Sequence, residues 1–169
     1  MDMNAICVND YLARITERLK TNGFVISNNK SYKGQLFDFI AKRKRFEMER
    51  FGFFTTIFLF SSLNNPSLKV LNDFSTKSFQ YAIQSDKLHF TRGFLYGILC
   101  IPVAIIDDVD EDMIKVIHNS DFPKHWAASE KLVVFSTKTN GLYYSEKTPD
   151  WGSMYHNWDR QFIKEMLTP

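Results

Sequence analysis

The stretch FDFIAKRKRFEMERFGFF, residues 37–54, places a carboxylate ahead of a cluster of cations on a segment with the composition of a β-strand. The carboxylate is Asp38, and five basic residues follow it: Lys42, Arg43, Lys44, Arg45 and Arg50. Clustered cations can contact the phosphates of a nucleic acid. Charged residues also protect an exposed strand from edge-to-edge association. The stretch is therefore the wall of an active site, a contact strip for a polyanion, or the solvated edge of a sheet.

Side chains alternate along a strand, and this separates the stretch into two faces. One face carries Asp38, Ile40, Lys42 and Lys44, and the other carries Phe37, Phe39, Ala41, Arg43 and Arg45. We expect the core face to be the one with Phe37, Phe39 and Ala41. Lys42 lies two pleats from Asp38, roughly 13 Å at the usual rise. An alternative to catalysis is that Asp38 is a partly exposed strand residue bonded to a neighbouring backbone or to a lysine.

Composition bounds the class of protein. We expect residues 1–169 to form a single domain, and the net charge of +2 is too small to identify a polyanionic partner. The two cysteines, Cys7 and Cys100, give no disulfide framework and favour a reducing compartment. The N-terminal residues lack a signal-peptide pattern, and the longest apolar run, GILCIPVAII, is too short to span a bilayer. We therefore expect a cytoplasmic protein without membrane contact.

Periodicity and turn residues predict the order of the elements. The predicted elements are a helix at 9–22, strands at 24–29, 35–46 and 53–62, a helix at 65–83, a strand at 98–106, a helix at 107–119, a hairpin at 131–147 and a helix at 157–167. Asn9 and Asn65 are the predicted caps of the first two helices. Pro102 has no amide donor, so we expect a bulge or an interrupted ladder in the fourth strand.

The first six of these elements follow the order αβββαβ. In this order the chain resembles the core of the restriction-endonuclease-like superfamily, also called PD-(D/E)XK. The resemblance implies an α/β fold with a mixed sheet flanked by helices, to which this chain adds a C-terminal α-β-hairpin-α extension. It also implies the hydrolysis of a phosphodiester with one or two Mg²⁺ ions held by converging carboxylates.

The resemblance implies an acid on the second strand and a Glu/Asp-X-Lys motif on the third. Asp38 matches the first position, whereas residues 53–61 contain neither an acid nor a lysine. The substitutes in this sequence are Glu17 or Glu47 as the second acid, and Lys42 or Lys77 as the cation. Glu17 and Lys77 are otherwise ordinary exposed helix residues. We therefore expect no intact nuclease site and no cofactor, except Mg²⁺ at Asp38 if the protein is a nuclease.

Two further clusters contain residues that can stack or titrate. One is His125 with Trp126, and the other holds Trp151 and Trp158. Tryptophan can stack on a base or ring, and histidine can ligate a metal or transfer a proton. Both clusters can instead close the end of the core and anchor the last helix. The spacing of the histidines gives no zinc motif.

Three functions are compatible with the sequence. The first is a non-catalytic binding or regulatory module on a degenerate nuclease-like fold. The second is a divalent-metal-dependent nuclease, and the third is a protein-interaction module that uses exposed aromatic residues. A partner is therefore either a nucleic acid or a protein, and the sequence identifies neither.

Overall fold

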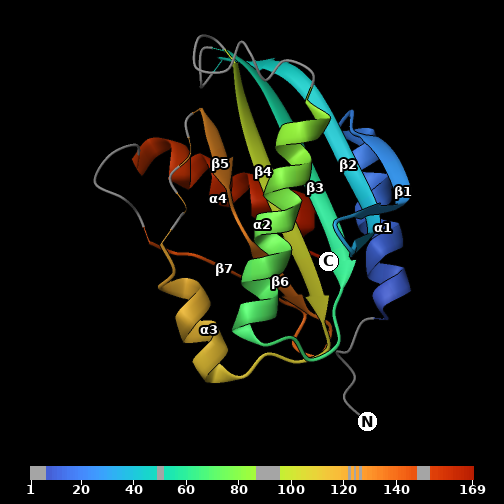
Figure 1. Ribbon diagram of the computed structural model, residues 1–169, viewed down its shortest axis with the longest axis vertical. Helices are drawn as coiled ribbons and strands as arrows, with labels where there is room; N and C mark the ends of the chain where they lie inside the picture. Colours follow the sequence, from blue (N-terminus) through green and yellow to red (C-terminus); the bar gives the residue numbers. More distant parts are fainter. Residues whose placement is uncertain are drawn as a thin grey trace.

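The computed structural model describes residues 7–48, 52–86, 96–121, 123, 125, 127–147 and 153–169, with the backbone alone at 153–156. In this part of the chain, seven strands form one mixed sheet that has helices on both faces (Figure 1). The predicted α/β class is confirmed. None of the described helices is long and apolar enough to cross a membrane. Three residues predicted to be functional, Arg50, Trp126 and Trp151, lie outside the described residues.

The first half of the chain supplies an antiparallel meander and one parallel crossover. Its elements are α1 (Val8–Thr21), β1 (Val25–Tyr32), β2 (Gln35–Glu47), β3 (Gly52–Ser62), α2 (Leu68–Ser85) and β4 (Tyr96–Ile106). Strands β1, β2 and β3 pair antiparallel, and β4 pairs parallel to β3 after the α2 crossover. The predicted order and the parallel pairing are therefore confirmed.

The second half of the chain extends the sheet beyond β4. Its elements are α3 (Glu111–His118), β5 (Ala128–Glu130), β6 (Val133–Ser136), β7 (Gly141–Tyr144) and α4 (Ser153–Leu167). Strands β5 and β6 both pair parallel to β4, and β7 pairs antiparallel to β6. The sequence did not predict β5, because three residues are too few to show an alternation.

Helices cover the two faces of the sheet as pairs. Helices α1 and α4 pack with one face, and α2 and α3 pack with the other. Figure 1 shows α2 lying along one side of the sheet, while α1 and α4 lie behind it. In α1 the buried residues Tyr11, Ile15 and Leu19 recur every four positions, which gives the single apolar stripe that such a helix needs. The sheet is therefore the middle layer, and both of its faces are buried.

The predicted core face of β2 is wrong at one position. Phe39 and Ala41 lie in the cluster beneath α1 and α4, but Phe37 lies in the cluster beneath α2. Pairing between β2 and β3 stops at Phe39 and Phe60, so residues 35–37 pair with β1 alone and their side chains do not keep the faces that hold from Phe39 onward. Ile40 is also buried, on the α2 side, because both faces of this strand are covered.

Helix starts also differ from the prediction. Helix α1 begins at Val8, with Cys7 and not Asn9 at the cap position. The cap of α2 is Ser67, whose hydroxyl accepts a hydrogen bond from the Val70 amide, so the helix begins after Asn65. Helix α3 begins only at Glu111, because Asp110 caps it by accepting a hydrogen bond from the Met113 amide at 2.7 Å. Before α2 and α3 more than one Asn, Ser or Asp residue is suitable as the cap, and the sequence does not show which of them is used.

Pro102 marks a gap in the ladder, as expected. On the β3 side the pairing runs without a break past Leu59 and Pro102. On the other side, β5 pairs with residues 98–100 of β4 and β6 pairs with residues 103–106. Pro102, which has no amide hydrogen to donate, therefore lies opposite the residues that connect β5 to β6, where no strand partner requires one.

Helix α4 is fixed to the rest of the molecule by polar contacts as well as by its apolar side. Lys131, between β5 and β6, lies 3.1 Å from the Asp159 carboxylate, and the two side chains are 3% and 4% exposed. The Tyr11 hydroxyl donates to the Leu167 carbonyl at 3.0 Å, and burial raises the pKa of Tyr11. The Arg18 guanidinium donates to carbonyls of the last turn of α4 and to that of Thr168.

The Lys131–Asp159 ion pair gives the first prediction. Lys131→Met removes one partner and leaves a buried carboxylate without its cation, so the free energy of unfolding should fall by about 3–5 kcal/mol. The double variant Lys131→Met/Asp159→Leu removes both charges and should recover most of this loss. Urea denaturation of the two variants measures the difference. Equal stability of the single and double variants would contradict the assigned pair.

Candidate functional site

Asp38 lies at the start of β2 and is engaged by the end of β3. Its Oδ2 accepts hydrogen bonds from the Ser62 amide at 2.7 Å and from the Ser62 hydroxyl at 2.8 Å. This is a bond to a neighbouring backbone, the alternative to catalysis that the sequence offered. Glu47 lies at the opposite end of the same strand, nine residues away, which is roughly 30 Å at the usual rise. A single metal ion does not bridge these two carboxylates.

Glu17 and Lys77, two of the other residues suggested for a nuclease site, are also far apart in the fold. Glu17 forms an exposed ion pair with Lys20 at 2.8 Å on α1, and Lys77 forms one with Asp73 at 2.8 Å on α2. Helices α1 and α2 cover opposite faces of the sheet. Within the described ranges, no group of three His, Cys, Asp or Glu residues is placed to hold a metal ion.

The basic run on β2 is divided between the two faces of the sheet. Lys42 Nζ donates to the Ser85 carbonyl at 2.9 Å, at the end of α2, and Lys44 Nζ lies 4.6 Å from the centre of the Tyr96 ring. Burial lowers the pKa of Lys42, and the negative charge of Asp86 opposes this shift. Arg43 faces the other way, toward α4. The four cations therefore do not form one continuous strip.

Arg43 is the most deeply buried cation of this run, with 8% of its surface exposed. Its guanidinium carbon lies 4.4 Å from the centre of the Phe24 ring and 5.5 Å from that of Phe162. Nη1 donates to the Asn22 carbonyl at 2.9 Å, which satisfies one group at the end of α1. Nε and Nη2 are buried and have no hydrogen-bond partner. The guanidinium therefore has donor atoms that the described protein groups do not use.

Charges around Arg43 are mixed. Burial lowers the pKa of Arg43 to about 10, and the positive charge of Arg45 adds to this shift. The carboxylates of Glu47 and Glu165 act in the opposite direction. Glu47 is itself buried, with Oε1 3.6 Å from Arg45 Nε, so part of the local positive charge is already balanced.

A cavity of about 270 Å³ opens beside this group, between β2 and α4. It is lined by Asn22, Arg43, Arg45, Trp158, Gln161, Phe162, Glu165 and Met166. Trp158 stacks on Phe162 with ring centres 5.3 Å apart and an angle of 6° between the rings. The cavity therefore combines two guanidinium groups, two side-chain amides and an indole with one carboxylate, that of Glu165. Hydrogen-bond donors of this kind match the oxygens of a carboxylate or a phosphate.

His125 and Trp158 were predicted as members of aromatic clusters, and the fold separates them. Trp158 lines the cavity on the α4 face. His125 stacks on Phe79 of α2, with ring centres 3.8 Å apart, and thus lies on the opposite face. Its Nε2 lies 2.9 Å from Glu130 Oε2. The sequence did not single out Glu130, because a lone glutamate beside a lysine has no distinctive pattern.

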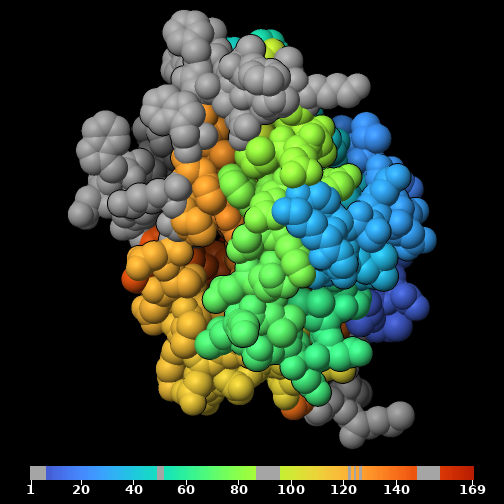
Figure 2. Space-filling model, viewed as in Figure 1, coloured from blue at the N-terminus to red at the C-terminus, as the bar shows by residue number. Residues whose placement is uncertain are grey.

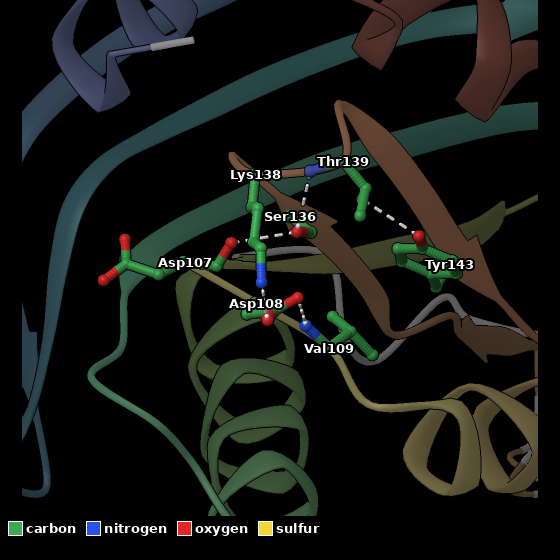
Figure 3. A network of polar contacts seen from close by, with 7 residues as sticks. All are labelled: Asp107, Asp108, Val109, Ser136, Lys138, Thr139 and Tyr143. Atoms are coloured by element: carbon green, nitrogen blue, oxygen red, sulfur yellow. Dashed lines mark hydrogen bonds and ion pairs between the residues drawn. The ribbon is translucent and has the colours of Figure 1, made fainter. Parts of the chain in front are cut away.

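A separate polar network lies at the carboxyl ends of β4 and β6 (Figure 3), where open α/β sheets commonly bind ligands. Asp108 accepts from the Val109 amide at 2.9 Å and from Lys138 Nζ at 2.6 Å. Ser136 Oγ donates to the Asp107 carbonyl at 3.0 Å, and Figure 3 shows the Asp107 carboxylate pointing away from the network. These contacts join two loops. The network is therefore explained by the fold itself.

Asp108 gives the second prediction. The pKa of its carboxyl group lies below the ordinary value, chiefly because the side chain accepts a hydrogen bond from Lys138. Lys138→Met should raise this pKa toward the ordinary value, as measured by a carboxyl-carbon NMR titration. The stabilisation from this contact is present above the ordinary pKa and is lost as the pH falls through the lowered one.

The matched control is Lys115→Met, which removes a cation from the exposed Lys115–Asp112 pair on α3. This variant should leave the titration of Asp108 unchanged. An Asp108 pKa that is the same in Lys138→Met and in the unmodified protein would show that the contact does not form in solution.

Comparison of the chain with protein-family models gives no match, and comparison with curated proteins and with solved structures gives none either.

Proposed function

We propose that this protein is a non-catalytic binding module that holds a small oxyanion in the cavity between β2 and α4. The observation that supports this function is the buried Arg43 guanidinium, whose Nε and Nη2 have no hydrogen-bond partner beside the cavity. A buried donor without an acceptor is destabilising by about 1–3 kcal/mol, and more when it is charged. Both atoms are covered by neighbouring protein groups, so a carboxylate or phosphate in the cavity supplies the missing acceptors once the guanidinium shifts within its own plane toward the cavity.

The planar guanidinium favours an oxyanion over other ligands. Its donors form a rigid fork that matches two oxygens of one carboxylate or phosphate group. Stacking against Phe24 and Phe162 fixes the plane of this fork before the ligand arrives. A receptor group that is already ordered loses less conformational entropy on binding. Arg45, whose side chain is 48% exposed, adds a second cation at the same cavity.

The charge balance favours a small anion over a nucleic acid. High affinity for a nucleic acid needs several phosphate contacts spread over a wide face. Here Glu165 lines the same cavity as the two arginines, and Lys42 and Lys44 lie on the opposite face of the sheet. A single oxyanion fits beside Arg43 and Arg45. A polyanion extends further and also lies against the Glu165 carboxylate, which repels it.

Trp158 favours a ligand with a planar apolar part. Its ring lines the cavity and is held by the stack with Phe162. Small-molecule sites commonly combine an aromatic wall with a few polar groups that fix orientation. A volume of about 270 Å³ suits a ligand of modest size, such as an aryl phosphate or an aryl carboxylate.

This proposal retains the resemblance to the restriction-endonuclease-like core, with Asp38 bonded to Ser62 in place of a metal ion. It also retains a cytoplasmic location, predicted from the two cysteines. Cys7 is exposed and Cys100 is buried, and both are free thiols. A reducing compartment keeps an exposed thiol in this form.

Binding of phenyl phosphate and benzoate, measured by calorimetry, tests the function and gives the third prediction. At least one of these anions should bind, and Arg45→Gln should weaken it about tenfold to a hundredfold, as expected for the loss of a charged hydrogen bond. Lys44→Gln is the matched control, because it removes the same charge from the adjacent strand position on the opposite face. It should bind as the unmodified protein does.

Three results would contradict the proposal. The first is no binding of either anion, and the second is equal weakening by Arg45→Gln and Lys44→Gln. The third is tight, salt-sensitive binding of a DNA or RNA duplex that Lys44→Gln weakens more than Arg45→Gln, which would favour the nucleic-acid alternative. A phosphorus NMR spectrum of phenyl phosphate after long incubation should stay unchanged, whereas release of inorganic phosphate would show catalysis.

A further inference from the structure

A second cavity, on the α2 face of the sheet, has the opposite electrostatic character. Its volume is about 290 Å³, and it lies between α2, α3 and the segment around β5. Figure 2 shows the surface hollowed between α2, in green, and the yellow and orange segment that contains α3 and β5. Its apolar lining consists of Leu68, Leu71, Val116, Ile117, Pro123 and Leu132. Its walls are thus mainly apolar, with polar groups at a few points.

Glu130 is the buried charged group among the described residues that line this cavity. It is the last residue of β5, pairs with Cys100 of β4, and has 6% of its surface exposed. A charged carboxylate in such a place is costly unless other groups hold it. Ser75 Oγ donates to Glu130 Oε1 at 2.5 Å, and His125 Nε2 lies 2.9 Å from Oε2.

These two partners fix the carboxylate but do not use its full capacity. An ionised carboxylate has about four acceptor positions, and Ser75 and His125 occupy two of them. His125 is itself held by its stack on Phe79, so the orientation of Glu130 is set from both sides. The carboxylate therefore has acceptor capacity left on the side that lines the cavity.

The surroundings of Glu130 add to its negative potential. Asp121 lies among the lining residues, and so does Ser120, next to the C-terminal end of α3, where the helix dipole is negative. Burial raises the pKa of Cys100, and the negative charge of Glu130, its neighbour on β5, adds to this shift. Lysine, arginine and histidine are absent from the described residues that line the cavity. Exposed Asp121 pairs with Lys147 at 2.9 Å, so Glu130 is the main charge of the cavity when the imidazole of His125, 2.9 Å from its carboxylate, is neutral.

We propose that this cavity binds a small organic ammonium ion, with its charged nitrogen at Glu130 and its apolar body between Leu71 and Ile117. The ammonium group supplies donors to the unused acceptor positions of the carboxylate. The apolar walls exclude water and strengthen this contact. The apolar body contributes by burying its surface against α2 and α3. This site is independent of the anion cavity, from which the sheet separates it.

Benzylammonium and its neutral counterpart benzyl alcohol test the proposal, with binding followed by amide chemical shifts in NMR. Benzylammonium should bind at least tenfold more tightly than benzyl alcohol, with the largest shifts at Ser75, Ile117 and Ser145. Glu130→Gln, which preserves the shape but removes the charge, should reduce the affinity for benzylammonium at least tenfold. Glu111→Gln removes the same charge from an exposed position in the first turn of α3 and should leave the affinity unchanged.

A second variant keeps the test decisive if Glu130→Gln does not fold. Asn72 is exposed and lies among the cavity residues, so Asn72→Trp fills the cavity without removing a buried group. This variant should lose binding of benzylammonium while it keeps its fold. The proposal is overturned if the amine and the alcohol bind equally, if neither binds, or if Asn72→Trp binds benzylammonium as the unmodified protein does.

Discussion

The position of α4 against the sheet depends on one buried ion pair, between Lys131 and Asp159. Lys131 lies between β5 and β6, the two strands that pair with β4, so the pair joins the last helix to this part of the sheet. Two charges buried this deeply are stable only when each has the other. Helix α4 in turn supplies Trp158, Gln161, Phe162 and Glu165 to the cavity around Arg43. Without α4 over it, the guanidinium would lie on an open strand and be solvated like any surface arginine.

The same junction in the sheet also positions the second cavity. Pro102 has no amide to donate, and the partner of β4 changes from β5 to β6 near this residue. Glu130 ends β5 immediately before this change, and Lys131 follows it with its amide donating to the Cys100 carbonyl at 2.9 Å. Because side chains alternate along the chain, the two charges point to opposite faces. A glutamate thus faces α2 and a lysine faces α4, from two adjacent residues.

Much of the architecture could be predicted from local patterns. Helix α1 has an apolar stripe at helical spacing and ends at Asn22 and Gly23, where Gly23 takes a φ of 79°. Strand β3 is a continuous apolar run, as expected for a strand covered on both faces. The two faces of β2 were assigned correctly from Phe39 onward, because the ladder with β3 keeps the alternation there. The assignment was wrong at Phe37, because the position at which pairing with β3 ends is set by the fold and not by the local sequence.

The candidate sites could not be predicted in the same way, because their properties arise from helices that are distant in the sequence. The basic run of residues 42–45 was visible, but its division depends on which helix covers each face: Ser85 of α2 accepts from Lys42, and Phe162 of α4 stacks near Arg43. Ser75 and Glu130 lie 55 positions apart and meet only after the crossover is formed. The place of Asp38 near the start of a strand could be predicted from the sequence. Its hydrogen bonds to Ser62 could not, because they depend on how β3 is aligned with β2.

A buried charge in this protein is explained either by a partner or by a ligand, and the two cavities differ in this respect. Lys131 and Asp159 neutralise one another, so they need nothing further. Glu130 has a serine and a histidine, which satisfy part of its acceptor capacity and leave its charge facing an apolar wall. Arg43 has two rings and one carbonyl, which stabilise its charge but leave Nε and Nη2 unsatisfied. The ammonium ion and the oxyanion proposed above would supply a partner of opposite sign to each of these two charges.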